Sequence, residues 1–112
     1  MSSSPVFRID KFVVPPRSRD VFLDRLRMTH RLLDEADGCD QNLVLEQTGG
    51  DGRYNVVTFV QWRDASCYEV AKHRSHSAQT TQGFDPAAFM AELGIVADLG
   101  DYQGLVSIST IP

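Results

Sequence analysis

The sequence predicts an α+β protein in which two helices cover one face of a four-stranded antiparallel sheet. Three observations support this prediction. Four segments have strand composition, one long segment repeats its apolar residues with a helical period, and a glycine-rich tetrapeptide joins two of the strands. A chain of 112 residues has room for one domain, so we expect residues 1–112 to form a single unit with residues 1–5 as a disordered tail.

The first strand and the long helix follow from periodicity. Residues 6–14 (VFRIDKFVV) alternate with a period of two, and the prolines at 15–16 end the strand because proline cannot donate a ladder hydrogen bond. Ser18 is placed to cap a helix of about 19 residues, which Gly38 ends in a left-handed conformation. The predicted core-facing stripe of this helix comprises Phe22, Leu26, Thr29, Leu33 and Ala36.

A hairpin and a second helix come next. Residues 42–48 and 54–62 are rich in apolar and β-branched side chains, as strands are, and the glycine-rich residues 49–52 form the turn between them. Asp64 is placed to cap the second helix, which we expect over residues 65–78.

The last part of the chain completes the pattern. A polar stretch at 79–83 interrupts the chain, Asp85 and Pro86 open a short third helix that Gly94 ends, and residues 105–111 (LVSISTI) are the predicted fourth strand. The order strand, helix, strand, strand, helix, short helix, strand is the split pattern of a ferredoxin-like α+β sandwich.

Composition and charge argue against several classes of protein. A net charge of −4 and a pI near 5.2 do not give the basic face that nucleic-acid binding needs. The longest stretch without Asp, Glu, Lys or Arg, residues 102–112, is far shorter than the roughly 20 apolar residues of a membrane span. Cys39 and Cys67 are too few for a disulfide scaffold and lack a paired metal-binding spacing. We expect a cytoplasmic protein that binds neither nucleic acid nor membrane.

Both faces of the predicted sheet are apolar. In the third strand Val57 and Phe59 occupy one parity, whereas Val56, Val60 and Trp62 occupy the other. Two helices cover only one face, and exposed apolar surface costs about 25 cal/mol per Å². We therefore expect a second copy of the chain to cover the other face, which gives a homodimeric barrel.

Three polar residues interrupt these apolar positions. Arg8, Asp10 and Thr58 are expected in or beside a mostly apolar cavity, whose composition suits a small aromatic or polycyclic ligand. The alternative is that the two sheets pack as a solid core in which Thr58 only fills space.

Several motifs resemble a known family. They are FVVPPRSRDVFLDRLR at residues 12–27, the helix end ADGC at 36–39, the hairpin, and above all FVQWRDASCYEVAKHRSH at 59–76. In this order and spacing they resemble the antibiotic biosynthesis monooxygenase domain of the dimeric α+β barrel superfamily. The resemblance covers roughly residues 6–80, and residues 79–102 look less typical of the family.

The resemblance implies particular site residues. The family includes small oxygenases that oxidise polycyclic phenols to quinones without metal or flavin. In that type it implies a cavity tryptophan closing the third strand, matched by Trp62, and a tyrosine early in the second helix, matched by Tyr68. The asparagine of that type falls at Thr58, which cannot present a separate donor and acceptor. This departure puts in doubt a mechanism in which an amide holds phenolate and oxygen together.

The family also includes haem-degrading enzymes. For these the resemblance implies an asparagine on the first strand, the same tryptophan, and an axial histidine on the second helix. The first position falls at Asp10, whose carboxylate would face a negatively charged porphyrin. The axial histidine falls at His73 or His76, and neither spacing from Trp62 matches that of the family cleanly. We therefore expect no cofactor, and a haem-degrading enzyme is the less favoured alternative.

Each candidate residue also has an ordinary structural role. Trp62 is either a stacking wall for the ligand or a plain core aromatic, and Tyr68 either orients a substrate oxygen or lies over the sheet edge. Asp10, when buried, is a proton acceptor; otherwise it pairs with Arg8 or Lys11.

The three histidines have different expected roles. His73 and His76 are three residues apart on the second helix; one could act as a general base, and one could lie on the surface. His30 falls opposite the predicted stripe and is expected to be solvated. We place Trp62, Tyr68, Asp10 and His73 among the catalytic candidates, and Thr58, Phe12, Val60 and His76 among the substrate-binding ones.

Two functions follow from these patterns. The first is a small homodimeric monooxygenase, without a cofactor, acting on an aromatic or quinol-type molecule. A base removes a proton from the substrate, and the electron-rich anion then reacts with dioxygen in a dry pocket. The alternative, favoured by the departures at Thr58 and Asp10, is a non-catalytic dimeric barrel that binds a small hydrophobic ligand or serves as a structural partner.

Overall fold

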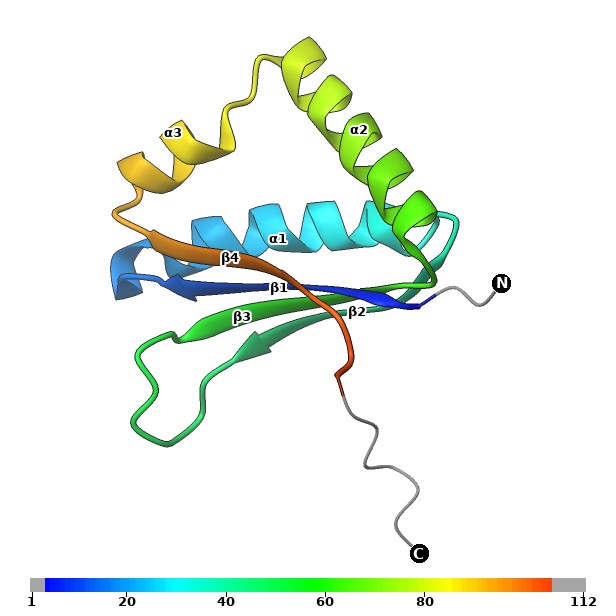
Figure 1. Cartoon of the computed structure of the whole chain (residues 1–112). Helices are drawn as coiled ribbons and strands as arrows, with labels where there is room; N and C mark the ends of the chain where they lie inside the picture. Colours follow the sequence, from blue (N-terminus) through cyan, green and yellow to red (C-terminus); the bar gives the residue numbers. More distant parts are fainter. Residues whose placement is uncertain (1–3, 106–112) are drawn as a thin grey trace, which may run out of the picture.

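The structure is a computed structural model that describes residues 4–105. Its elements are β1 (Val6–Val13), the 3-10 turn η1 (Pro16–Ser18), α1 (Arg19–Leu33), β2 (Cys39–Glu46), β3 (Val56–Trp62), α2 (Ala65–Gln82), α3 (Pro86–Glu92) and β4 (Val96–Tyr102). The strands form one antiparallel sheet in the order β2-β3-β1-β4, and the helices lie on one side of it (Figure 1). The predicted ferredoxin-like α+β fold is confirmed.

Side-chain caps begin two of the helices as predicted. The carboxylate of Asp64 accepts a hydrogen bond of 2.9 Å from the backbone N–H of Cys67 at the start of α2. The carboxylate of Asp85 accepts from the backbone N–H groups of Ala87 and Ala88 at the start of α3. Each cap satisfies donors that have no partner within the helix.

Several predicted boundaries were wrong. α1 ends at Leu33 after 15 residues, before the glycine at position 38, and β2 is Cys39–Glu46 and not 42–48. α2 does not stop before residues 79–83 but continues to Gln82, where Gly83 ends it with a φ of 66°. Serine, threonine and glutamine weaken a helix only slightly, so no residue before the glycine breaks it. The last strand is Val96–Tyr102, and Leu105 lies after it. The rest of the predicted strand at 105–111 lies outside the described residues.

The start and the buried side of α1 also differ from the prediction. Ser18 makes no capping bond; its hydroxyl donates instead to the carbonyl oxygen of Leu93 at 2.6 Å, which ties this end of α1 to the end of α3. Thr29 is exposed and donates to Arg25 within the helix, whereas His30 is buried and faces the sheet. The core-facing stripe therefore passes through His30, and the expectation that His30 is solvated was wrong.

The register of β1 against β3 decides which side chains share a face. Asp10 pairs with Thr58, and Arg8 pairs with Val60, so these four side chains point to the same side. The alternate residues of β3 from Val56 to Trp62 are buried on that side, which is the side that carries the helices.

Two apolar clusters lie between the sheet and the helices. The larger is built from Phe12, Val14, Phe22, Leu23, Val56 and Ile95. The smaller joins Val60 and Trp62 of β3 to Tyr68 of α2, and Leu33 of α1 packs against it. The polar residues of the sheet lie between these two clusters.

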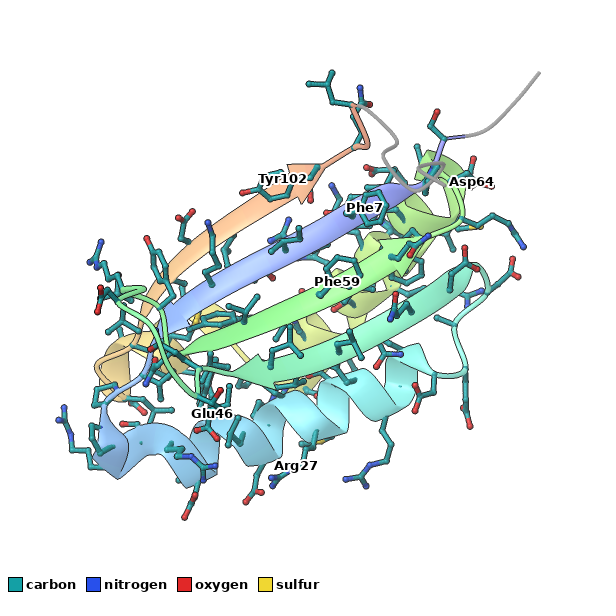
Figure 2. The ribbon with its side chains drawn as sticks, turned by 90° about the horizontal axis from the view of Figure 1, so that it is seen from below. Phe7, Arg27, Glu46, Phe59, Asp64 and Tyr102 are labelled. Atoms are coloured by element: carbon teal, nitrogen blue, oxygen red, sulfur yellow. The ribbon has the colours of Figure 1, made fainter. Side chains whose placement is uncertain are left out.

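The opposite face of the sheet has no cover within residues 4–105. Phe7 and Phe59 lie on it with ring centroids 5.8 Å apart, and Figure 2 shows both, with Tyr102, on the face away from the helices. Leu43 and Leu45 of β2 are 39% and 48% exposed on the same face. This apolar face is separate from Arg8, Asp10 and Thr58, so the polar residues lie beneath the chain's own helices and not on the open face of the sheet.

Candidate functional site

An arginine organises the polar centre of the helix-facing side. Arg8 donates from Nε to Oδ1 of Asp10 at 2.7 Å, and from Nη1 to Oδ1 of Asp101 at 3.0 Å. The same nitrogen donates to the hydroxyl of Tyr68 at 3.2 Å, and that hydroxyl donates to Asp101 at 2.5 Å. One cation thus holds two carboxylates and a phenol that come from β1, β4 and α2.

The network displaces the pKa values of its two carboxyl groups in opposite directions. Burial raises the pKa of Asp10, although the Arg8 guanidinium opposes this shift. The hydrogen bond from Tyr68, together with Arg8, lowers the pKa of Asp101. Burial, together with the hydrogen bond to Asp101, raises the pKa of the Tyr68 phenol. Asp10 is therefore the more basic carboxylate of the site.

An aromatic layer lies beside the charged groups. Trp62 and Tyr68 are 3% and 8% exposed, and their ring centroids are 6.2 Å apart with an interplanar angle of 35°. Val60 packs in the same cluster. A flat aromatic molecule would find apolar ring surface next to charged groups here.

The site opens toward β4. Leu99 pairs with Asp10 and therefore points to the helix side of the sheet, yet it is 50% exposed. The side chain of Asp101 is 47% exposed and that of Asp10 is 19% exposed. Solvent and ligands can thus approach the Arg8 network over the edge strand, while Trp62 remains buried.

A second polar group, which the sequence analysis missed, lies on the other side of the sheet centre. Nδ1 of His30 is 3.2 Å from Oδ1 of Asn42 on β2, and Nδ2 of Asn42 donates to Asp34 at 2.8 Å. Burial lowers the pKa of His30 from its ordinary value, although Asn42 and the nearby carboxylates of Asp34 and Asp10 oppose the shift. The available signal was the spacing of Leu26, His30 and Leu33, which places the histidine on the apolar side of α1.

Most of the predicted site residues share one face. Asp10, Phe12, Thr58, Val60 and Trp62 all point to the helix side of the sheet, and Tyr68 meets them from α2. Phe12 belongs to the larger apolar cluster, where it packs edge-on against Phe22.

His73 and His76 stand apart from this group. Both are exposed on α2, and both are outside the Val60–Trp62–Tyr68 cluster. The expectation that one of them faces the site is therefore not met. The buried histidine of the site comes from α1.

A groove lies between α1 and α2. It has a volume of about 700 Å³, and its apolar lining includes Met28, Leu32 and Val70. Part of its wall, including Leu33 and Ala71, also packs against the Trp62–Tyr68 cluster. The groove therefore adjoins the back of the aromatic layer.

The described residues contain neither a cluster of metal ligands nor a helix suited to span a membrane. Within residues 4–105, no three histidine, cysteine, aspartate or glutamate side chains come together as ligands of one ion. In the same range, no helix has both the length and the apolar character needed to cross a bilayer.

Comparisons with known proteins support the fold. No family model matches the sequence, and no curated protein matches it. A candidate monooxygenase from Shewanella loihica PV-4 shares 13% identity over 96% of this chain and 100% of that chain, with a TM-score of 0.69. A variant of SnoaB, a cofactor-independent oxygenase from Streptomyces nogalater, shares 18% identity over 96% and 99% of the two chains, with a TM-score of 0.66.

Two other solved structures share the fold. A dimeric ferredoxin-like protein from an uncultured marine organism shares 12% identity over 96% of this chain and 100% of that chain, with a TM-score of 0.59. The heme-degrading protein Rv3592 from Mycobacterium tuberculosis shares 17% identity over 96% and 99%, with a TM-score of 0.57. At these identities the likeness establishes the fold, which oxygenases share, and gives no substrate.

Proposed function

We propose that this chain is a small oxygenase that acts on an aromatic or quinol-type molecule with dioxygen and needs no cofactor. The observation that carries the proposal is the Arg8 network beside the Trp62–Tyr68 layer. It places a basic carboxylate, a fixed cation and a phenol next to an aromatic surface at an opening of the fold. These are the groups needed to remove a substrate proton and to stabilise the resulting anion.

The proposed reaction begins with loss of a substrate proton and ends with a carbonyl and water. A base takes a proton from an acidic O–H or activated C–H of the substrate, and Arg8 stabilises the anion. The electron-rich carbon passes electrons to dioxygen and forms a carbon–peroxide bond. Cleavage of the O–O bond, with proton delivery, leaves a carbonyl and releases water: R₂CH₂ + O₂ → R₂C=O + H₂O. Tyr68 could relay the proton: its hydroxyl, which donates to Asp101 in the resting site, would turn to the peroxide and then recover a proton from the protonated base.

The proposed active form is a homodimer. The uncovered face carries Phe7, Phe59 and Leu45, and such a face is costly to leave in water. Packing the same face of a second copy against it would bury these side chains around a two-fold axis. Each site would then lie beneath the helices of one subunit.

A non-catalytic ligand-binding protein is the second candidate. The groove between α1 and α2 favours it, because a volume of about 700 Å³ lined by Met28, Leu32 and Val70 suits a small hydrophobic molecule. In addition, Thr58 stands where the cofactor-free oxygenases of the resembling family have an amide, so one of their polar groups is missing.

Haem fits this site poorly. The histidines of α2 are exposed, and the carboxylates of Asp10 and Asp101 would lie near an anionic porphyrin. We therefore assign no step to haem. Addition of hemin to the purified protein should give no change typical of histidine ligation in its absorption spectrum.

Oxygen uptake tests the proposed function. The purified protein, dialysed against a chelator, is mixed with an anthrone or a naphthohydroquinone, and oxygen consumption is recorded together with the quinone spectrum. Anthrone should consume one O₂ for each quinone formed, and Trp62→Phe and Tyr68→Phe should lower kcat/KM about tenfold or more. Arg31→Gln, at an exposed position of α1 away from both the site and the proposed interface, is the control and should match wild type. Lack of uptake with every phenol and quinol in a panel would reject the oxygenase, and ligand binding in the groove would then favour the second candidate.

A further inference from the structure

Two polar atoms beneath α1 have no hydrogen-bond partner within residues 4–105. They are Nε2 of His30 and Oγ1 of Thr58, in residues that are only 9% and 5% exposed. In the same part of the chain, every fully buried side-chain nitrogen or oxygen has a partner. Neither atom is therefore fully buried, and each retains some accessible surface through which a ligand atom could bond to it.

Hydrogen bonding fixes which nitrogen of His30 is basic. The carboxylate of Asp34 can only accept, so it turns the amide NH₂ of Asn42 toward itself. The carbonyl oxygen of Asn42 then faces Nδ1 of His30 at 3.2 Å and can only accept as well. Nδ1 must therefore carry the proton in neutral His30, which leaves an unpaired lone pair on Nε2.

The sheet register relates the strand residue that holds His30 to the Arg8 network. Asn42, which holds His30, is two residues from Val44, and Val44 pairs with Thr58 on β3. Thr58 pairs in turn with Asp10 on β1. Paired side chains on one face lie about 4.5–5.5 Å apart at Cβ, so Thr58 lies between the strands that carry the His30 group and the Arg8 network.

We propose that Nε2 of His30 is the base that takes the acidic O–H proton of the bound phenol, with the Thr58 hydroxyl holding the same oxygen. The inference rests on the proposed function for the phenolic class of the substrate and deepens it by assigning the phenol proton to His30. Asp10, whose Oδ1 is held by Arg8, then supports the imidazolium by its charge. In this step the O–H bond breaks, its electron pair stays on oxygen, and the proton forms a new bond to Nε2. Arg8 remains the fixed cation for the resulting anion.

The surrounding charges are compatible with proton uptake at His30. Asp34, the residue directly after α1, and Asp10 on β1 both favour the imidazolium. Asn42 on β2 and Thr58 on β3 are uncharged side chains. Burial keeps the ring neutral beforehand, because it lowers the pKa of His30. A neutral imidazole with an accessible Nε2 is the form that can accept a proton.

Binding of 4-nitrophenol tests the inference without any oxygen chemistry. Its anion is yellow, so absorption reports the protonation state of the bound phenol. Wild type should bind it as the anion at a pH where the free phenol is protonated. His30→Asn keeps a donor toward Asn42 but lacks Nε2, and should weaken binding about tenfold or more and abolish the yellow signal. Arg31→Gln, at the next and exposed residue of α1, should behave as wild type.

Nitrogen NMR of the unmodified chain gives a second readout that needs no folded variant. His30 should carry its neutral proton on Nδ1, and its Nε2 resonance should move toward the imidazolium value when 4-nitrophenol binds. The inference is overturned by an Nε2–H tautomer, by absence of nitrophenol binding to wild type, or by wild-type binding in both His30→Asn and His30→Gln. Anion binding that depends on His30, without oxygen uptake from any substrate, would support this base while rejecting the oxygenase function.

Discussion

Arg8 donates a 2.7 Å hydrogen bond to Asp10, its neighbour two residues along β1, and a second bond of 3.0 Å to Asp101 on β4. The two carboxylates share one cation but differ in burial, and their pKa values move apart: burial raises that of Asp10, and the hydrogen bond from Tyr68 lowers that of Asp101. Separated pKa values allow two groups to take different protonation roles at one pH. In the proposed reaction Asp101 stays ionised and holds Tyr68, while Asp10 faces the substrate region.

Loss of the Arg8 cation should destabilise the fold. Arg8→Met removes three hydrogen bonds and leaves Asp10 as a partly buried carboxylate without its partner, so we expect the free energy of unfolding to fall by about 2 kcal/mol or more. Urea unfolding at neutral pH measures this loss. Lys11→Met is the matched control, because its pair with Asp98 is long, at 3.9 Å, and lies on the opposite face. It should cost less than about 1 kcal/mol, and equal losses in the two variants would contradict the role given to Arg8.

His30 should make stability depend on pH in the mildly acidic range. Its pKa in the folded chain is lowered by burial, so the unfolded chain binds the proton more readily. The stabilising contribution is therefore fully present above the ordinary histidine pKa of about 6.5, and it is lost as pH falls from there through the lowered value. Wild type should lose stability over this window, and His30→Gln should show a flatter profile. Urea midpoints collected across the window measure the difference, and parallel profiles would show that His30 is not buried as described.

The positions of most elements could be predicted from the sequence, whereas the side that carries the site could not. Strand period, prolines and capping aspartates are local signals, and β1, β3 and the start of α2 followed them. Both parities of β3 are apolar, so nothing local says which one lies under the helices. Only the packing of Val56 and Trp62 against helical residues decides it. The same uncertainty hid the location of the Arg8 network.

Two wrong predictions, the exposure of His30 and the position of the last strand, each have a physical cause. His30 was missed because the choice between Thr29 and His30 for the core stripe is a rotation of a single residue, and a polar side chain on an apolar stripe looks like a surface residue. The last strand was misplaced because Asp98, Gly100 and Asp101 weaken the strand signal of residues 96–102. Those residues are tolerated because β4 is an edge strand, and one of the aspartates belongs to the site.

Gly38 should be hard to replace for two separable reasons. It has a φ of 80°, and a Cβ at this position would lie 2.5 Å from Sγ of Cys67. Gly38→Ala should therefore cost about 2–4 kcal/mol, the sum of left-handed strain and overpacking. Gly83→Ala is the matched variant, since Gly83 has a φ of 66° and open space around it, and it should cost only about 1–2 kcal/mol. Thermal or urea unfolding measures both.

A double variant separates the two terms at Gly38. A Cβ at Gly38 would meet both Sγ and Cβ of Cys67, at 2.5 and 2.6 Å, so Cys67→Gly is the background that removes both atoms. Gly38→Ala should cost less in that background than in wild type. The remaining cost should approach that of Gly83→Ala. An unchanged cost would assign the whole effect to the backbone and would contradict the close approach of α2 to the α1–β2 connection.

The oligomeric state tests the uncovered face of the sheet. Phe59 lies in the middle of that face, opposite Ile9 on β1 and Leu43 on β2, and its ring lies 5.8 Å from that of Phe7. We expect wild type to sediment as a dimer and Phe59→Lys to shift it to a monomer, because a lysine at the centre of a two-fold interface would place two ammonium groups in an apolar environment. Leu32→Lys is the control, since Leu32 is 71% exposed on α1 and lies away from this face, so its dimer should persist. Sedimentation of wild type as a monomer at micromolar concentration would contradict the shared interface. Oxygen uptake by such a monomer would show that the site beneath the helices works within a single chain.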